Sequence, residues 1–224
     1  AIVGESGCGK STVVNMLIGA YRPKAGIVAV GGKPLESVTR ESYYSHIASV
    51  SYNTYIFNDT VRANFELAKQ NVSDEEIWAA LEKVNLAGFI KENGGLDKVI
   101  TEDANNVSGG QKQRLALAVN LVADKDIYVF DEATSNIDIE SEAIIMRNIK
   151  AMSADKSVIV ISHRLANVVP ADNIYFMEEG EVKERGSHAQ LMAASGGYAK
   201  LFNAQKQLEE GYKEITGIAA EVKA

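Results

Sequence analysis

The chain has 224 residues, of which 46% are hydrophobic, and a formal net charge of −7. This length and composition allow a full hydrophobic core, in one domain or in a domain with a subdomain. The acidic balance argues against general nucleic-acid binding, and no apolar run approaches the roughly 20 residues of a membrane-spanning helix. With Cys8 as its single cysteine, the sequence excludes an internal disulfide and is compatible with a reducing compartment.

The first residues predict a buried strand that leads into a phosphate-binding loop. Residues 1–3 are apolar, and residues 4–12 fit G-x-x-x-x-G-K-[ST], the loop of P-loop NTPases. Glycines let the backbone turn so that consecutive N–H groups face one anion. We expect Lys10 to bring a positive charge to the β- and γ-phosphates, and the Ser11 hydroxyl to complete a Mg²⁺ shell. The predicted nucleotide-binding residues of this loop are Gly4, Ser6, Gly7, Cys8, Gly9, Lys10, Ser11 and Thr12.

The loop runs into a predicted helix from about Lys10 to Gly19, whose positive end would point at the phosphates. The sequence also starts almost on top of the loop, without an initiator Met. A strand at this position normally has chain before it, so we expect an excised or trimmed piece of a longer protein. Natural processing or an unrecorded terminus is the alternative.

Further short apolar runs, separated by helical patterns, predict an α/β protein with a parallel sheet covered on both faces. A strand at 26–32 ends in a Gly-Gly turn, and residues 174–185 form a hairpin around Glu179-Gly180. Residues 198–212 predict a polar helix, after which we expect the tail to be frayed or disordered. The buried parallel strands are predicted at 1–3, 47–51, 127–130 and 158–161.

About 75 residues between the second and third of these strands have helical character and no convincing strand. Ser73 is a good N-cap, and Glu76 completes a capping box with it. A long helical insertion in an α/β core predicts a separate subdomain. The apolar stripe of its clearest helix is Ile77, Leu81 and Val84, with Trp78 packed in or beside it.

Two acids end the predicted strand at 127–130. Ligands of open parallel sheets bind at the carboxyl ends of the strands, which is where Asp131 and Glu132 lie. We expect Asp131 to bind Mg²⁺ through water, and Glu132 to orient and deprotonate an attacking water. A solvated acidic turn is the alternative, and the phosphate loop in the same chain disfavours it.

A second helix start that could bind an anion follows about 100 residues after the first. Ser108 is a good N-cap, and Gly109 and Gly110 expose their amides beside it. One γ-phosphate scarcely needs two such anion-binding helix starts from one chain. The second helix start is better explained if it binds a nucleotide held by another subunit.

Taken together, these motifs resemble the nucleotide-binding domain of an ATP-binding cassette (ABC) transporter of the exporter type. Residues 53–62 and 186–188 also resemble exporter sequences, and the likeness covers roughly residues 1–202. Five motifs in the family's order make a chance match negligible. The motifs are the Walker A loop Gly4–Thr12, the signature Val107–Gln111, the Walker B strand Ile127–Asp131 followed by Glu132, the D-loop Ser135–Asp138 and the H-loop Ser162–Arg164.

The resemblance implies a fold: an α/β P-loop NTPase with a RecA-like parallel sheet core and an inserted α-helical subdomain. Residues 1–224 would form one nucleotide-binding domain. Its core would span 1–51 and 124–190, its helical subdomain 52–123 and its C-terminal helical tail 191–224. The N-terminal antiparallel strands of the family are missing from this sequence.

The resemblance also implies a head-to-tail dimer that holds two ATP molecules at its interface. His163 would contact the γ-phosphate and help position the attacking water, and Asp138 would carry contacts across the interface as well as capping the helix at 139–152. The catalytic set would be Glu132, His163 and Lys10, and the metal ligands Ser11 and Asp131. The other subunit would close over each ATP with Ser108, Gly109, Gly110 and Gln111.

The implied cofactors are ATP and Mg²⁺. The implied partners are a second nucleotide-binding domain and the transmembrane domain of an exporter on the same polypeptide, at the cytoplasmic face of the plasma (inner) membrane. Nucleic acid is not an expected partner.

The sequence departs from the family pattern in three places. Tyr52 stands where the Q-loop has Gln, and a phenol is a poor ligand for a hard cation. In the segment 100–106 only Glu102 matches well, which puts coupling to a membrane domain in doubt. The aromatic residue that stacks on adenine lies upstream of Walker A in the family, so none can be assigned.

Three readings of Tyr52 remain open: weaker Mg²⁺ binding, a retuned coupling surface, or an engineered or subgroup-specific change. We favour weaker Mg²⁺ binding with catalysis retained. At the level of function, the leading hypothesis is the ATPase of an exporter. There are two alternatives: a regulatory half that clamps ATP with little turnover, and a non-transport ABC ATPase. Non-transport ABC ATPases usually carry a coiled coil or a second cassette, and neither fits this sequence.

Overall fold

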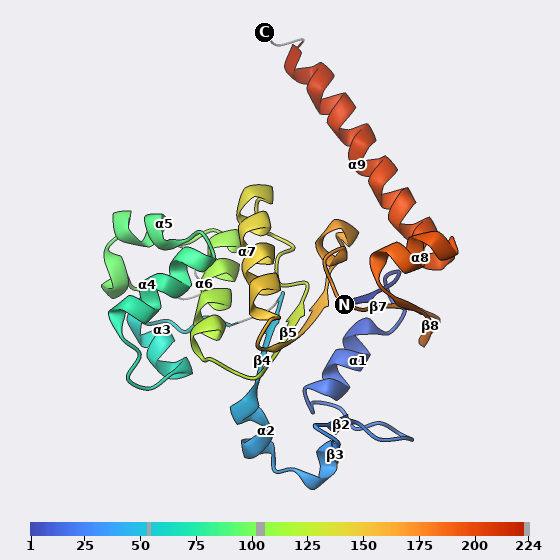
Figure 1. Ribbon diagram of the computed structural model, residues 1–224. Helices are drawn as coiled ribbons and strands as arrows, with labels where there is room; N and C mark the ends of the chain where they lie inside the picture. Colours follow the sequence, from blue (N-terminus) through green and yellow to red (C-terminus); the bar gives the residue numbers. More distant parts are fainter. Residues whose placement is uncertain (53–54, 102–105, 222–224) are drawn as a thin grey trace. The chain divides into compact units, whose positions relative to one another are not determined.

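The computed structural model describes residues 1–52, 55–101 and 106–221, with side chains up to residue 211 (Figure 1). They divide into two compact units. Unit 1 joins Ala1–Lys10 to the chain from Ile161 onward, and unit 2 is Ser11–Val160. Predictions that concern residues 53–54 and 102–105, including Glu102, lie outside the described residues.

Unit 1 contains a small mixed sheet and the C-terminal helices. Strand β1 pairs in parallel with β7 and with Ile161, the last residue of β6, while β7 and β8 form the predicted antiparallel hairpin. Helix α9 continues beyond the rest of the unit as one long rod, drawn in red in Figure 1. The elements are β1 (Ile2–Val3), η4 (Leu165–Val168), β7 (Ile174–Glu178), β8 (Glu181–Gly186), α8 (His188–Ala194) and α9 (Gly197–Glu221).

The prediction of a frayed or disordered tail after Tyr212 is wrong, because α9 continues to Glu221. The last turns contain Glu, Lys and Ala, which favour helix, and no proline. These local preferences outweigh the two glycines, Gly211 and Gly217.

Unit 2 contains the parallel strands and most of the helices. Strands β4 and β5 pair in parallel from Ile47 opposite Ile127 to Ser51 opposite Asp131, and β5 neighbours β6. The elements are α1 (Lys10–Leu17, which starts in unit 1), β2 (Ala29–Val30), β3 (Lys33–Pro34), η1 (Leu35–Ser37), α2 (Arg40–His46), β4 (Ile47–Ser51), α3 (Val61–Ala68), α4 (Asp74–Lys83), α5 (Ala87–Glu92), η2 (Gly95–Asp97), α6 (Gly109–Val122), β5 (Ile127–Asp131), α7 (Ile139–Met152) and β6 (Ser157–Ile161).

The Gly-Gly turn predicted near residue 32 makes a hairpin rather than the end of a long strand. Gly31 and Gly32 have φ of 59° and 77°, and β2 and β3 on either side of them pair in antiparallel fashion over two residues each. A two-residue turn with positive φ at both positions matches the right-handed twist of a hairpin.

The predicted helical insertion is confirmed. Among the residues described between β4 and β5, helices α3–α6 occur and no strand beyond a single bridge from Thr60 to Val99. Ser73 and Glu76 form the predicted capping box at the start of α4, and Trp78 packs against the core. In Figure 1 helices α3–α6, coloured from teal to yellow-green, lie together, and α7, in yellow, lies next to α6.

One hydrophobic core joins β4 and β5 to helices α3–α7. It positions the end of β5, because the strand's apolar side chains are buried on both faces. Across the described ranges, no helix combines the length and apolar character needed to cross a membrane. The largest fully buried side chains of this core are Tyr128, Phe65, Phe130, Ile77, Leu81, Leu86, Ile90, Ile100, Leu115, Leu117 and Ile145.

Candidate functional site

The predicted phosphate loop of unit 1 adopts backbone angles that require glycine. Gly4, Gly7 and Gly9 have φ of 151°, 81° and 104°. A Cβ on Gly4 would lie 2.2 Å from the carbonyl oxygen of Met177, whereas one on Gly7 would meet nothing within 4 Å. The loop is therefore closely packed at Gly4 and open at Gly7, where a phosphate can approach its backbone.

Lys10 is buried and folds back over this loop. Its Nζ donates to the carbonyl oxygens of Gly4 at 2.9 Å and Glu5 at 2.8 Å, and lies 3.8 Å from Cys8 Sγ. The side chain is 6% exposed. An ammonium held in a glycine loop at a helix start is the donor set that a triphosphate needs, so these residues fit a nucleotide.

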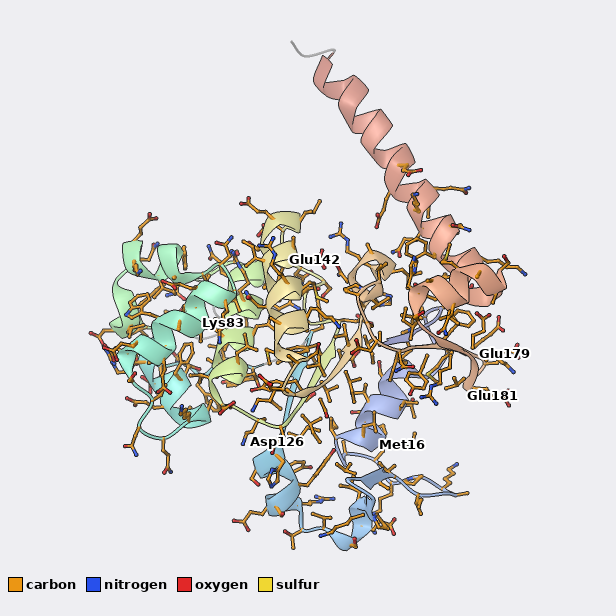
Figure 2. All side chains as sticks on the ribbon, viewed as in Figure 1. Met16, Lys83, Asp126, Glu142, Glu179 and Glu181 are labelled. Carbon is orange, nitrogen blue, oxygen red and sulfur yellow. The ribbon has the colours of Figure 1, made fainter. Side chains whose placement is uncertain are left out.

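The β7–β8 hairpin supports the back of the loop, a contact that the sequence did not predict. The Gly180 N–H donates to the carbonyl oxygen of Cys8 at 3.1 Å. A Cβ on Gly9 would lie 3.7 Å from Met177 Cε and 3.8 Å from Gly180 Cα. Glu179, labelled in Figure 2, lies with Gly180 at the hairpin turn, where both have positive φ. The only signal for this turn in the sequence was its Glu-Gly pair.

Ser11 and Thr12 are exposed in the first turn of α1, in unit 2. Asp131 ends β5 in the same unit, opposite Ser51 of β4. In the part of the chain that the structure describes, no group of three or more His, Cys, Asp or Glu could hold a metal. The two predicted ligands, the Ser11 hydroxyl and the Asp131 carboxylate, present hard oxygen atoms of the kind that fits Mg²⁺.

Glu132 follows the strand in a left-handed conformation, with φ of 55°. Such a conformation costs a non-glycine residue about 1–2 kcal/mol, so the surroundings must hold it. The Gln113 Nε2 donates to the carbonyl oxygen of Glu132 at 3.2 Å, and the Asn136 N–H donates to Gln113 Oε1 at 3.2 Å. Two residues after Glu132, the Thr134 hydroxyl donates to Glu142 Oε1 at 2.8 Å.

The signature segment starts helix α6 with a complete capping box. The Gln111 N–H donates to Ser108 Oγ at 3.2 Å, and the Ser108 N–H donates to Gln111 Oε1 at 2.8 Å. A Cβ on Gly110 would lie 2.7 Å from the carbonyl oxygen of Asn136, whereas Gly109 has open space. The signature and the D-loop of the same chain are therefore packed against each other.

Asp138 is the N-cap of α7, as predicted, and accepts from the Ser141 N–H at 2.8 Å. Arg114 Nη1 lies 4.0 Å from its carboxylate. The Ser141 N–H and hydroxyl, and then the Arg114 charge, hold the pKa of the Asp138 carboxyl below its ordinary value. The Asp138 side chain is 59% exposed, so it remains accessible while it caps α7.

His163 is exposed in unit 1, and its backbone is held by the C-terminal helix. Gln205 of α9 donates from Nε2 to the carbonyl oxygen of His163 at 2.7 Å. The Leu165 N–H donates to Gln205 Oε1, also at 2.7 Å. This contact has no signal in the sequence, because Gln205 lies in a polar helix 40 residues beyond Leu165.

The predicted site residues fall into two sets. Unit 1 holds the loop up to Lys10 together with His163, and unit 2 holds the remainder. Within unit 2 the structure brings the signature, the D-loop and Glu132 together through Gly110 and Gln113. The unit 2 residues are Ser11, Thr12, Ser108, Gly109, Gly110, Gln111, Asp131, Glu132 and Asp138.

The family profile described as ABC transporter matches residues 1–135, more than half of the chain. The chain belongs to the ABC transporter family. Its members' domains of this type bind ATP, which agrees with the loop of unit 1.

Relatives of this ABC domain are much longer than the chain. An "Uncharacterized ABC transporter ATP-binding protein" of Haemophilus influenzae is 46% identical over 93% of the chain and 37% of its own length. An "ATP-dependent lipid A-core flippase" of Aliivibrio fischeri is 40% identical over 92% of the chain and 36% of its own length. The chain thus spans little more than a third of these proteins.

A solved structure extends the comparison to the fold. The "Structure of a bacterial Atm1-family ABC exporter with ATP bound" is 34% identical and superposes with a TM-score of 0.87, over 92% of this chain and 36% of that one. The predicted fold class, an α/β P-loop NTPase of the ABC type, is confirmed.

The contact between Gly110 and Asn136 generates a stability prediction. Gly110→Ala places a methyl group against a backbone carbonyl that must move, so we expect a loss of about 1–3 kcal/mol of unfolding free energy. Gly109→Ala is the matched control and should change stability by less than about 0.5 kcal/mol. Urea unfolding of both variants measures the difference, and equal stabilities would contradict this packing.

The capping role of Asp138 generates a pH prediction. Asp138→Ala should cost about 1 kcal/mol at pH 7, and Asp138→Asn much less because Asn also caps. The carboxyl pKa is lower in the folded state, so folding favours the ionised form. The part of the Asp138→Ala stability loss that depends on the carboxylate charge therefore has its full size above about pH 4. It disappears as the pH falls through the folded-state pKa of Asp138. Urea unfolding between pH 2 and 7 tests this, and a pH-independent loss would contradict it.

Proposed function

We propose that this chain is the ATP-hydrolysing domain of a membrane exporter, which it powers by ATP-driven head-to-tail dimerisation. The observation that carries the proposal is the phosphate loop, where left-handed glycines and the buried Lys10 ammonium form a cradle suited to a triphosphate. The names of the relatives support the exporter class, since one is a flippase and another an Atm1-family exporter.

In the proposed reaction, water attacks the γ-phosphorus of ATP, a new P–O bond forms, and the bond to the ADP oxygen breaks. Glu132 orients the water and accepts its proton, and Lys10 neutralises charge on the β- and γ-phosphates. Mg²⁺, held by Ser11 and Asp131, would supply charge neutralisation between the phosphates. His163 contacts the γ-phosphate and helps to place the water.

The dimer supplies the remaining groups. Ser108, Gly109, Gly110 and Gln111 of one subunit close over the ATP bound by the other, with Asp138 at the interface. The exposure of Ser108 and Asp138 supports this assignment, because both remain accessible after capping their own helices.

The proposed domain organisation follows the sequence: a core of 1–51 and 124–190, a helical subdomain of 52–123, and a helical tail of 191–224, together one nucleotide-binding domain. A transmembrane domain on the same polypeptide would place it at the cytoplasmic face of the plasma (inner) membrane. The chain matches little more than a third of these relatives, so a protein of their length has room for such a domain.

A second candidate is a regulatory half that binds ATP with little turnover. The observation that favours it is Tyr52, which directly follows the residue paired with Asp131 and is 54% exposed. At this place a phenol stands near the expected metal site, where the family has an amide.

Replacement of the proposed general base separates the two candidates. Glu132→Gln should retain ATP binding and ATP-dependent dimerisation, and should lower the hydrolysis rate by about 10²–10⁴-fold because the base is lost. Steady-state phosphate release, ATP binding and light scattering measure these three properties.

Glu140→Gln is the matched control, since Glu140 is exposed on α7 and the substitution is the same. It should leave the rate unchanged. Wild-type turnover in Glu132→Gln would remove Glu132 from the role. A wild-type protein that binds ATP but does not complete a single turnover would favour the regulatory candidate.

Tyr52→Gln tests the departure at the Q-loop. We expect the variant to reach its half-maximal rate at a lower Mg²⁺ concentration, because an amide oxygen is a better ligand for a hard cation than a phenol. A Mg²⁺ titration of ATPase activity measures it, with Tyr55→Gln, at another exposed tyrosine, as control. An unchanged Mg²⁺ dependence and rate would refute the hypothesis.

A further inference from the structure

Two glutamine carboxamides hold the backbone beside the two residues that are proposed to act on the attacking water. Gln113 bridges the turn after β5: it donates to the Glu132 carbonyl and accepts from the Asn136 N–H. Its side chain is buried, with 6% of the residue exposed. A buried carboxamide has few other partners available, so it holds this turn in one geometry.

Gln205 makes the same kind of bridge in unit 1. It donates to the His163 carbonyl and accepts from the Leu165 N–H, each at 2.7 Å. The Ser162 hydroxyl accepts from the Arg164 N–H at 3.1 Å and so holds the same loop from within. The outer support of the loop comes from α9, a helix far along the chain.

A carboxamide is suited to this task because it presents one donor and one acceptor side by side. Each glutamine pairs with one C=O and one N–H of an irregular loop, and the Glu132 carbonyl also accepts from the Ser135 N–H at 3.2 Å. At Glu132 the bridge also holds a left-handed non-glycine residue, which needs such external support.

We propose that Gln113 and Gln205 are positioning residues, whose carboxamides set the backbone at Glu132 and His163 and thereby aim these two side chains. The inference rests on the proposed function, in which both side chains act on the water. Because Ser108 is the N-cap of α6, Gln113 also ties Glu132 to the helix that would meet the partner's ATP. Gln205 in the same way ties His163 to the C-terminal helix.

The first test measures kinetics. Gln113→Leu and Gln205→Leu keep the approximate side-chain size and remove both hydrogen bonds. Each should lower kcat by about tenfold, the net worth of the hydrogen bonds that each substitution removes, with KM for ATP within about twofold of wild type.

The controls are leucine substitutions on the same helices. Asn120 of α6 donates to the Ala116 carbonyl of its own helix at 2.8 Å, and Gln207 of α9 is exposed. Asn120→Leu and Gln207→Leu should leave kcat within about twofold of wild type, since neither substitution touches a loop that carries Glu132 or His163.

The second test measures the loops themselves by amide hydrogen exchange. In the leucine variants the amides of Asn136 and Leu165, respectively, should exchange faster. Gln113→Glu and Gln205→Glu keep an acceptor and lose the donor, so these amides should stay protected while kcat still falls. A lower kcat with protected amides would show that the variant affects the orientation of Glu132 or His163 and not the stability of the whole domain.

The proposal is overturned if kcat in both leucine variants stays within twofold of wild type, if the controls lose as much, or if the two amides exchange at the wild-type rate. A wild-type protein without ATPase activity would instead refute the proposed function. In that case the hydrogen-exchange measurement still decides whether Gln113 and Gln205 hold their loops. Unchanged exchange of the two amides in the leucine variants would refute this, and faster exchange would support it.

Discussion

The burial of β5 is the constraint on which the site of unit 2 depends. Tyr128, Val129 and Phe130 are at most 2% exposed. Burial of a large apolar side chain stabilises the folded state by about 1.5–3 kcal/mol. The parallel ladder with β4 fixes the strand's register, and helices α3–α7 share its core. Because the strand cannot slide, Asp131 and Glu132 emerge at one defined point, with Tyr52 just beyond the paired Ser51.

Backbone shape is controlled by two different means at two of the predicted motifs. In the phosphate loop, glycine at three left-handed positions avoids strain altogether. At Glu132 the proposed role as general base calls for a carboxylate, which glycine lacks. The bond that Gln113 donates to the Glu132 carbonyl and the bond that it accepts from the Asn136 N–H hold this turn in its unfavourable conformation.

Much of the fold could be predicted from sequence because it depends on local patterns. The buried strands, the capping boxes at Ser73 and at Ser108, and the cap at Asp138 all involve residues within a few positions of each other. The prediction of where α9 ends is wrong, because the sequence after Tyr212 has no clear signal for where the helix stops. The two glycines at 31–32 reverse the chain into the short β2–β3 hairpin, whereas the sequence predicts only the end of a strand there.

The sequence alone determined the chemistry: which residues could bind phosphate, which acids end a buried strand, and which family these motifs resemble. Only the tertiary structure decided what supports them: the Gly180 turn behind the phosphate loop, Gly110 against Asn136, and the bridges from Gln113 and Gln205. The physical reason is range. Motif chemistry lies in neighbouring residues, whereas a hydrogen bond between residues 19 or 42 positions apart leaves no periodic trace in the chain.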